Sequence, residues 1–122
     1  MAKHIDLGKL GEDIAIRYLK KKKYRVIERN YRMRLGELDI VALAPDKTLV
    51  LVEVKTVSGP NPKISGEDQM TAPKTHKFRR AAEIYASGDG ERFVSKAGWR
   101  TDLVTVEFDL NRETRVRHYQ NI

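Results

Sequence analysis

The chain of 122 residues contains no cysteine and no long apolar segment. Without cysteine, disulfides, thiolate metal sites and cysteine nucleophiles are excluded. The longest unbroken apolar run, Ile40 to Ala44, is far shorter than the ~20 residues that cross a membrane, and the N-terminus has no apolar stretch typical of a secretory signal. We therefore expect no membrane association and a cytoplasmic protein that folds as a single domain over residues 1–122.

Positive charge exceeds negative charge, and it is concentrated in one segment. The whole chain carries a net charge of +7. The segment from Arg17 to Arg34 holds nine basic residues and one acid, which leaves the rest of the chain close to neutral. A basic stripe is typical of a protein that binds a phosphate backbone, because each neutralised phosphate releases counterions. The alternative is a solvated face whose lysines complement a helix dipole. The candidate nucleic-acid contacts in this segment are Lys20, Lys21, Lys22, Lys23, Arg25, Arg32 and Arg34.

The spacing of apolar residues predicts two helices and five strands. The helices are expected at Leu7–Lys22, with Asp6 as N-cap, and at Pro73–Ser87. Gly and Pro residues predict a loop over residues 56–69 beside the acidic strand ends described below. The predicted strands are Tyr24–Tyr31, Gly36–Ala44, Thr48–Lys55, Leu103–Val106 and Thr114–Tyr119. The first three form an antiparallel meander, because their connections are too short for crossovers, and the whole chain is expected to form one mixed α/β layer structure.

Acidic residues and one lysine lie at the ends of two adjacent predicted strands. Strand parity places Glu37 and Asp39 on one face of the second strand, and Glu53 and Lys55 on one face of the third. A carboxylate among Val and Leu residues, like that of Glu53, is unfavourable unless it is paired or holds a cation. Carboxylates that converge with a lysine suit a divalent-metal phosphodiester hydrolase. The alternative is a strand-end salt bridge without a metal.

Other candidate residues are more ambiguous. Glu12 borders the apolar stripe of the first predicted helix, from which its carboxylate can face a neighbouring cleft. Trp99 beside Arg100 is either a stacking platform for a base or a packing residue. Basic residues of the second helix either contact phosphates or form a solvated face; they are Lys74, Lys77, Arg79 and Arg80. The histidines are predicted to be ordinary surface residues: His4, His76 and His118.

A series of motifs in order along the chain resembles the YraN family of small bacterial proteins. The resemblance covers nearly the whole chain, and its main motifs are Gly11-Glu12-x-x-Ala15, Gly36-Glu37-Leu38-Asp39-Ile40, Val52-Glu53-Val54-Lys55-Thr56, Thr71-Ala72-Pro73-Lys74 and Arg100-x-Asp102-Leu103-Val104. That family looks like a branch of the PD-(D/E)xK restriction-endonuclease-like superfamily, close to archaeal Holliday-junction resolvases. The chain departs from the superfamily's pattern at Leu38, where proline is usual, and from the family's at Thr101, where phenylalanine is usual.

The resemblance implies a restriction-endonuclease-like αβββαβ core, with a mixed central sheet flanked by helices. It also implies site roles. Asp39 and Glu53, with the Val54 carbonyl, would hold magnesium or manganese; Lys55 would orient water or stabilise charge, and Glu12 would be an additional acid. Lys74 matches a lysine of the family.

The residues and the resemblance together predict a divalent-metal-dependent nuclease that binds nucleic acid. DNA is the expected partner, and branched DNA is a candidate substrate. A four-way junction as substrate would imply a homodimer, because two symmetric strands must be cut. The alternatives are a non-catalytic nucleic-acid-binding module of the same fold and a protein-interaction adaptor with a vestigial site.

Overall fold

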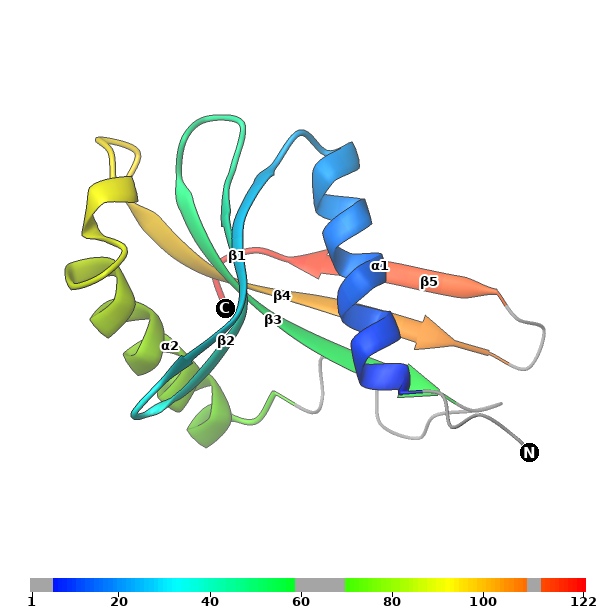
Figure 1. Cartoon of the computed structure of the whole chain (residues 1–122). Helices are drawn as coiled ribbons and strands as arrows, with labels where there is room; N and C mark the ends of the chain where they lie inside the picture. Colours follow the sequence, from blue (N-terminus) through cyan, green and yellow to red (C-terminus); the bar gives the residue numbers. More distant parts are fainter. Residues whose placement is uncertain (1–5, 59–69, 110–112) are drawn as a thin grey trace.

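The computed structural model describes residues 6–58, 70–109 and 113–122. Its centre is a five-stranded sheet in the order β1-β2-β3-β4-β5 (Figure 1). The strands are β1 (Arg25–Met33), β2 (Gly36–Leu43), β3 (Leu49–Ser58), β4 (Trp99–Phe108) and β5 (Thr114–Tyr119). β3 and β4 are parallel, and the other neighbouring strands are antiparallel. The predicted antiparallel meander, the mixed sheet and the central position of the third strand are confirmed.

Two helices, α1 (Leu7–Lys21) and α2 (Ala72–Ser87), pack on opposite faces of this sheet. Alternate residues of β3 face alternate helices: Val50, Val52 and Val54 belong to the core under α1, whereas Leu49 and Leu51 belong to the core under α2. The central strand is apolar on both faces because both faces are covered. Among the residues that the structure describes, no helix is long and apolar enough to cross a bilayer.

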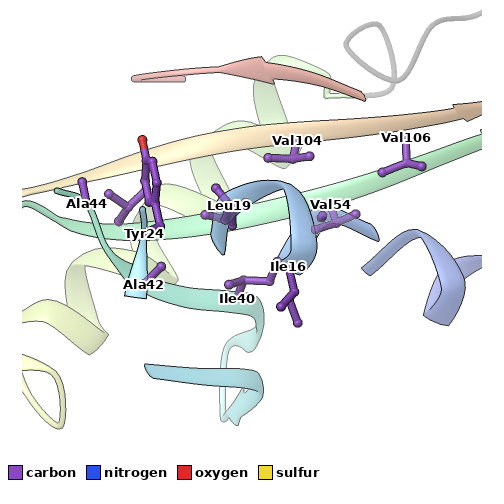
Figure 2. Packing of buried hydrophobic residues seen from close by; sticks show 12 residues of the cluster. Ile16, Leu19, Tyr24, Ile40, Ala42, Ala44, Val54, Val104 and Val106 are labelled. Carbon is purple, nitrogen blue, oxygen red and sulfur yellow. The ribbon is translucent and has the colours of Figure 1, made fainter. Parts of the chain in front are cut away.

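The core under α1 shows how the first helix is held in place. Ile16 and Leu19 of α1 pack with Val54 and Val104 of the sheet (Figure 2). The predicted N-cap is confirmed, because the side chain of Asp6 accepts a hydrogen bond from the backbone N–H of Lys9 at 3.1 Å. This packing fixes the position of the helix face that carries Glu12, the predicted acidic residue of the first helix.

The third and fourth strands are longer than the sequence pattern indicates. β4 begins at Trp99 rather than Leu103, because its first residues continue the parallel pairing with β3. Thr101 and Asp102 interrupt the apolar pattern, although both are buried. β3 continues to Ser58, so the first part of the expected loop over residues 56–69 is strand instead. The rest of that loop lies outside the described residues.

The sheet divides at the middle of β2. The pairing of β2 with β3 ends at Ile40 and Val52, whereas β2 stays paired with β1 as far as Gly36, opposite Met33. The end of the β1–β2 hairpin therefore leaves β3 and lies beside the first turns of α2 (Figure 1). We call the gap between this half of β2 and β3 the fork. The short 3-10 helix η1 (Glu91–Phe93) follows the end of α2 that lies away from the β1–β2 hairpin.

Candidate active site

Asp39 lies at the point where β2 leaves β3. Its Oδ2 accepts a hydrogen bond from the backbone N–H of Val54 at 2.8 Å, so a side chain replaces the missing backbone partner on β2. The N–H and the C=O of one residue in a strand point to the same edge. The carbonyl of Val54 is therefore directed toward the fork as well. A carboxylate and a backbone carbonyl thus face the same gap.

Glu53 and Lys55 project into the fork from β3. Lys55 Nζ lies 3.2 Å from Glu53 Oε1, and both side chains are largely buried. The carboxyl groups of Glu53 and Asp39 are close enough for each to influence the pKa of the other. Two carboxylates so close together are not easily ionised at the same time, so one of them tends to keep its proton. The pair can therefore hold a proton in a place where a cation would also be stabilised.

The electrostatics of this pair follow from burial and from the small number of donors. The pKa of Glu53 is raised to about 7: burial is the main cause, the charge of Asp39 adds to the increase, and Lys55 opposes it. Burial also raises the pKa of Asp39, while the N–H of Val54 lowers it. Because each of these carboxyl groups affects the ionisation of the other, they titrate together. The site therefore holds a proton close to neutral pH and would release it on binding a cation.

Glu12 reaches the same region from α1. Gly11 lies against the side chain of Thr56 on β3, where a Cβ atom would collide with the Thr56 hydroxyl. This close approach brings the next residue, Glu12, toward the fork. Burial raises the pKa of Glu12, and the negative charge of Asp39 adds to the increase. Glu12 is thus close enough to sense the charge of the Asp39–Glu53 pair.

Asn30 connects two of the acidic side chains. In the amide orientation that satisfies both acceptors, its nitrogen donates to Glu12 Oε1 at 2.7 Å and to Glu37 Oε1 at 2.9 Å. Asn30 adopts a positive φ of 53° inside β1, a conformation that Asn tolerates better than most residues. The sequence pattern alone does not predict this role of Asn30. The one signal for it is an asparagine inside a predicted strand, where that residue is uncommon.

A cavity of about 280 Å³ opens beside these residues. Acidic groups from the sheet form one part of its wall, and two lysines from the first turns of α2 form another. It is lined by Leu35, Gly36, Glu37, Asp39, Glu53, Lys55, Met70, Lys74, Lys77, Phe78 and Ala81. The cavity therefore combines a negative floor with a positive rim, an arrangement that suits a cation and a phosphate together.

The donor set fits a hard cation that keeps much of its water. Within residues 6–58, 70–109 and 113–122, no three His, Cys, Asp or Glu side chains gather closely enough to enclose a metal ion. The fork offers the carboxylates of Asp39 and Glu53 and the directed carbonyl of Val54. Magnesium is commonly held by one or two carboxylates together with waters and a substrate phosphate. The residues present fit magnesium or manganese, and they do not fit an all-protein cage.

The structure divides the predicted basic stripe into two surfaces. Lys74 lines the cavity, and Arg32 and Arg34 lie on the β1–β2 hairpin next to two lining residues. The other predicted contacts lie at the far end of α1 and in the residues that follow it, and the last residue of this helix is roughly 14 Å along the helix axis from Glu12. They are Lys20, Lys21, Lys22, Lys23 and Arg25; two of them line a separate cleft beside η1.

The prediction that His118 is an ordinary surface residue is wrong. Its Nε2 lies 2.7 Å from Oδ2 of Asp102, which is fully buried. Arg100 Nε donates to Asp102 Oδ1 at 3.0 Å, and Arg100 Nη2 donates to the Tyr24 hydroxyl at 2.9 Å. The backbone N–H of Asn121 also donates to Asp102. A buried carboxylate needs such donors, and only the folded sheet brings them together. His76 is exposed, as predicted, and His4 lies outside the described residues.

Comparison with known proteins places the chain among bacterial relatives of similar length. The model of a family described as "Uncharacterised protein family UPF0102" matches residues 11–106, which include all four predicted catalytic residues. A UPF0102 protein of Alkaliphilus oremlandii is 34% identical, with 94% of this chain and 95% of the relative covered. A UPF0102 protein of Mycobacterium avium is 37% identical, with 97% and 90% covered. One of Pelotomaculum thermopropionicum is 36% identical, with 94% and 92% covered.

The similar proteins also include a solved structure. It is that of Pyrococcus furiosus SfsA in complex with Ca2+, with a TM-score of 0.41 and 17% sequence identity. The match covers 94% of this chain and 62% of SfsA, so the chain spans less than two thirds of that protein.

Proposed function

The chain belongs to the uncharacterised protein family UPF0102, which is the YraN family that its sequence motifs resemble, and we propose that it is a divalent-metal-dependent nuclease with a PD-(D/E)xK restriction-endonuclease-like core. Family membership states a relationship and no activity, so the proposal rests on the site. The observation that carries it is the meeting of Asp39, Glu53 and Lys55 at the fork, beside a cavity with a basic rim.

The roles of the residues follow from their positions. Asp39, Glu53 and the carbonyl of Val54 would hold magnesium or manganese in the fork. When bound, the metal lowers the pKa of a coordinated water and neutralises charge on the phosphate. Lys55, which also lines the cavity, donates to the attacking water or to a phosphate oxygen on which negative charge develops. Glu12 is the additional acid near the fork, tied to Glu37 through Asn30.

The proposed partner is DNA, bound through its phosphates. Lys74 and Lys77 on α2, with Arg32 and Arg34 on the hairpin, would contact phosphates around the cavity. The basic residues at the end of α1 form a second contact surface away from it. Branched DNA is the proposed substrate form because separate arms of it would be able to contact the two surfaces at once. Cleavage of a four-way junction would further require a homodimer.

A second candidate function is nucleic-acid binding without catalysis. The Glu53–Lys55 ion pair and the Asp39–Val54 hydrogen bond give all three side chains a structural role in the absence of any metal. A binding module could retain them for that reason. This alternative predicts the same salt-dependent affinity for DNA and no metal-dependent cleavage.

Metal binding and cleavage can be measured separately. We expect manganese to bind the purified chain in isothermal titration calorimetry, and binding to be lost in Asp39→Asn. We also expect manganese-dependent cleavage within a panel of linear, flapped and four-way DNA. Lys55→Ala should abolish cleavage while metal binding persists, because Lys55 is not a ligand. Glu113→Gln is the matched control, since Glu113 is an exposed carboxylate next to β5.

Two results would overturn the nuclease proposal. One is metal-dependent cleavage that survives in both Glu53→Ala and Lys55→Ala, which would indicate a contaminating enzyme. The other is an absence of manganese binding at millimolar concentration together with intact DNA binding, which would favour the non-catalytic module.

A further inference from the structure

Trp99 is the one tryptophan in the sequence, and it lies at the start of β4 with 38% of its surface exposed. It pairs with Leu49 of β3, a residue of the core under α2, so it lies on the α2 face of the sheet. A groove of about 540 Å³ separates it from that helix, and the other lining residues are His76, Arg79, Arg80 and Glu83. We call this feature the Trp99 groove.

The Trp99 groove combines an accessible aromatic ring with cationic side chains. Its α2 wall carries two arginines and a histidine against one acid. Within the described ranges, neither Arg79 nor Arg80 forms an ion pair, and Glu83 forms none either. Both guanidinium groups are therefore available to an anion from outside. An apolar partner segment would have to desolvate them without compensation, which is costly.

Single-stranded nucleic acid satisfies both parts of the groove. A base can stack on an exposed tryptophan, and phosphates can pair with neighbouring arginines. Duplex DNA supplies the phosphates, but its bases are already stacked on one another. An acidic peptide supplies charge, but no planar group for the ring. The chemistry of the groove thus favours an unpaired strand.

The groove and the proposed catalytic cavity lie on the two sides of α2. Lys74 and Lys77 line the cavity, whereas Arg79 and Arg80 line the groove. A helix with its side chains is about 10–12 Å across, so a strand of a few nucleotides that crosses α2 can reach both places. The exposed basic residues of the helix would lie along that path.

We propose that the Trp99 groove binds a single-stranded segment of nucleic acid, with a base stacked on Trp99 and flanking phosphates on Arg79 and Arg80. This inference rests on the proposed function, since the bound strand would be part of that nuclease's substrate. It narrows the proposed substrate to DNA with an unpaired segment, such as a flap or a duplex whose two strands separate at one end. Binding in the groove itself requires no metal.

The test uses the whole chain in EDTA, so that metal-dependent cleavage cannot interfere. Oligothymidylate should quench the fluorescence of the single tryptophan in a saturable manner, because a stacked base lies against the ring. An abasic oligonucleotide of equal length and charge should bind more weakly and quench less. Trp99→Ala should lower the affinity for oligothymidylate about tenfold, as expected for the loss of one stacked base.

Matched variants distinguish the contribution of the Trp99 ring to affinity from the effects of misfolding and of positive charge elsewhere on the surface. Trp99→Phe keeps an aromatic ring and should retain most of the affinity, which controls for misfolding of Trp99→Ala. Arg79→Ala with Arg80→Ala should weaken binding more than Arg115→Ala, because Arg115 is an exposed arginine of β5 outside the groove. Circular dichroism would verify that each variant is folded.

Several results would overturn the inference. They are an unchanged tryptophan emission at saturating oligothymidylate, equal affinity for oligothymidylate and the abasic chain, and equal affinity of folded Trp99→Ala and wild type. Stronger quenching by polyglutamate would instead assign the groove to an acidic protein partner. Asp39→Asn should still show quenching. Failure of the nuclease proposal would therefore leave this result intact, and failure of the groove would leave cleavage measurable.

Discussion

Within the described residues, the sheet holds one fully buried acid, Asp102, and one partly buried pair, Asp39 and Glu53, and the two places differ in how many donors surround the acid. The carboxylate of Asp102 is hydrogen-bonded to the side chains of Arg100 and His118 and to the backbone N–H of Asn121, and it is completely buried. Asp39 accepts a hydrogen bond from the backbone N–H of Val54, and Glu53 has one lysine close by. Burial is compensated at the first site and only partly compensated at the second. The carboxylate of Asp102 is supplied with donors, whereas the pair at the fork is short of them, which suits the cation proposed for that place.

The largest effect is expected from removal of the compensated acid. Asp102→Ala leaves Arg100 and His118 without their acceptor in a buried place. We expect the free energy of unfolding to fall by about 3–5 kcal/mol, measured by urea denaturation. Glu113→Ala, which removes an exposed carboxylate, should change it by less than about 0.5 kcal/mol. A loss as small as that control would contradict a structural role for Asp102.

At the fork, we expect removal of the acid to raise the free energy of unfolding rather than to lower it. Burial raises the pKa of Glu53 from its ordinary 4.5 to about 7 in the folded protein. Its favourable contribution to stability is therefore complete below about pH 4.5 and is lost as the pH rises through 7. We expect Glu53→Gln to stabilise the metal-free chain at pH 8 by up to about 3 kcal/mol, and to do so far less at pH 5. Urea titrations at the two pH values measure this difference.

A pH-independent effect, or destabilisation at pH 8, would show that Glu53 is compensated as Asp102 is. Glu107→Gln serves as the control, because Glu107 is a half-buried glutamate on β4 opposite Arg115.

A bound metal should compensate the negative charge at the fork, as the surrounding donors compensate that of Asp102. A cation in the fork would add positive charge beside Asp39 and Glu53, where Lys55 is the cationic side chain already close by. At one hundred times its dissociation constant, manganese should stabilise the chain by about 2.7 kcal/mol, seen as a higher Tm in a thermal melt. The stabilisation should disappear in Asp39→Asn and remain in Glu113→Gln. Equal stabilisation of all three proteins would place the cation elsewhere.

The smallest effect is expected at the amide that joins Glu12 and Glu37. Asn30→Gly removes both hydrogen bonds while allowing the positive φ, and should cost about 1 kcal/mol. Asn30→Ala adds backbone strain at that φ and should cost more. Urea denaturation of both variants separates the amide from the backbone. If the two lose the same stability, the positive φ contributes nothing measurable.

The amino-acid sequence by itself determined the elements and the chemistry that they carry. Helical spacing located α1 and α2, and alternation located β2 and β5 almost to the residue, because burial on one face imposes a period that is visible locally. The motif residues Asp39, Glu53 and Lys55 were identified together because strand parity and the family resemblance agree. Where buried polar residues interrupted the pattern, as at Thr101 and Asp102, the strand was predicted too short.

Only the tertiary structure decided how these residues meet. The fork exists because β2 stops pairing with β3 at Ile40 and turns with β1 toward α2, which no local pattern encodes. The same packing brought Asn30 between two glutamates, enclosed Asp102 and divided the basic stripe between two surfaces. Such contacts join residues far apart in the chain. They depend on where strands separate and how closely a helix approaches, and those distances are set by the packing of the whole sheet.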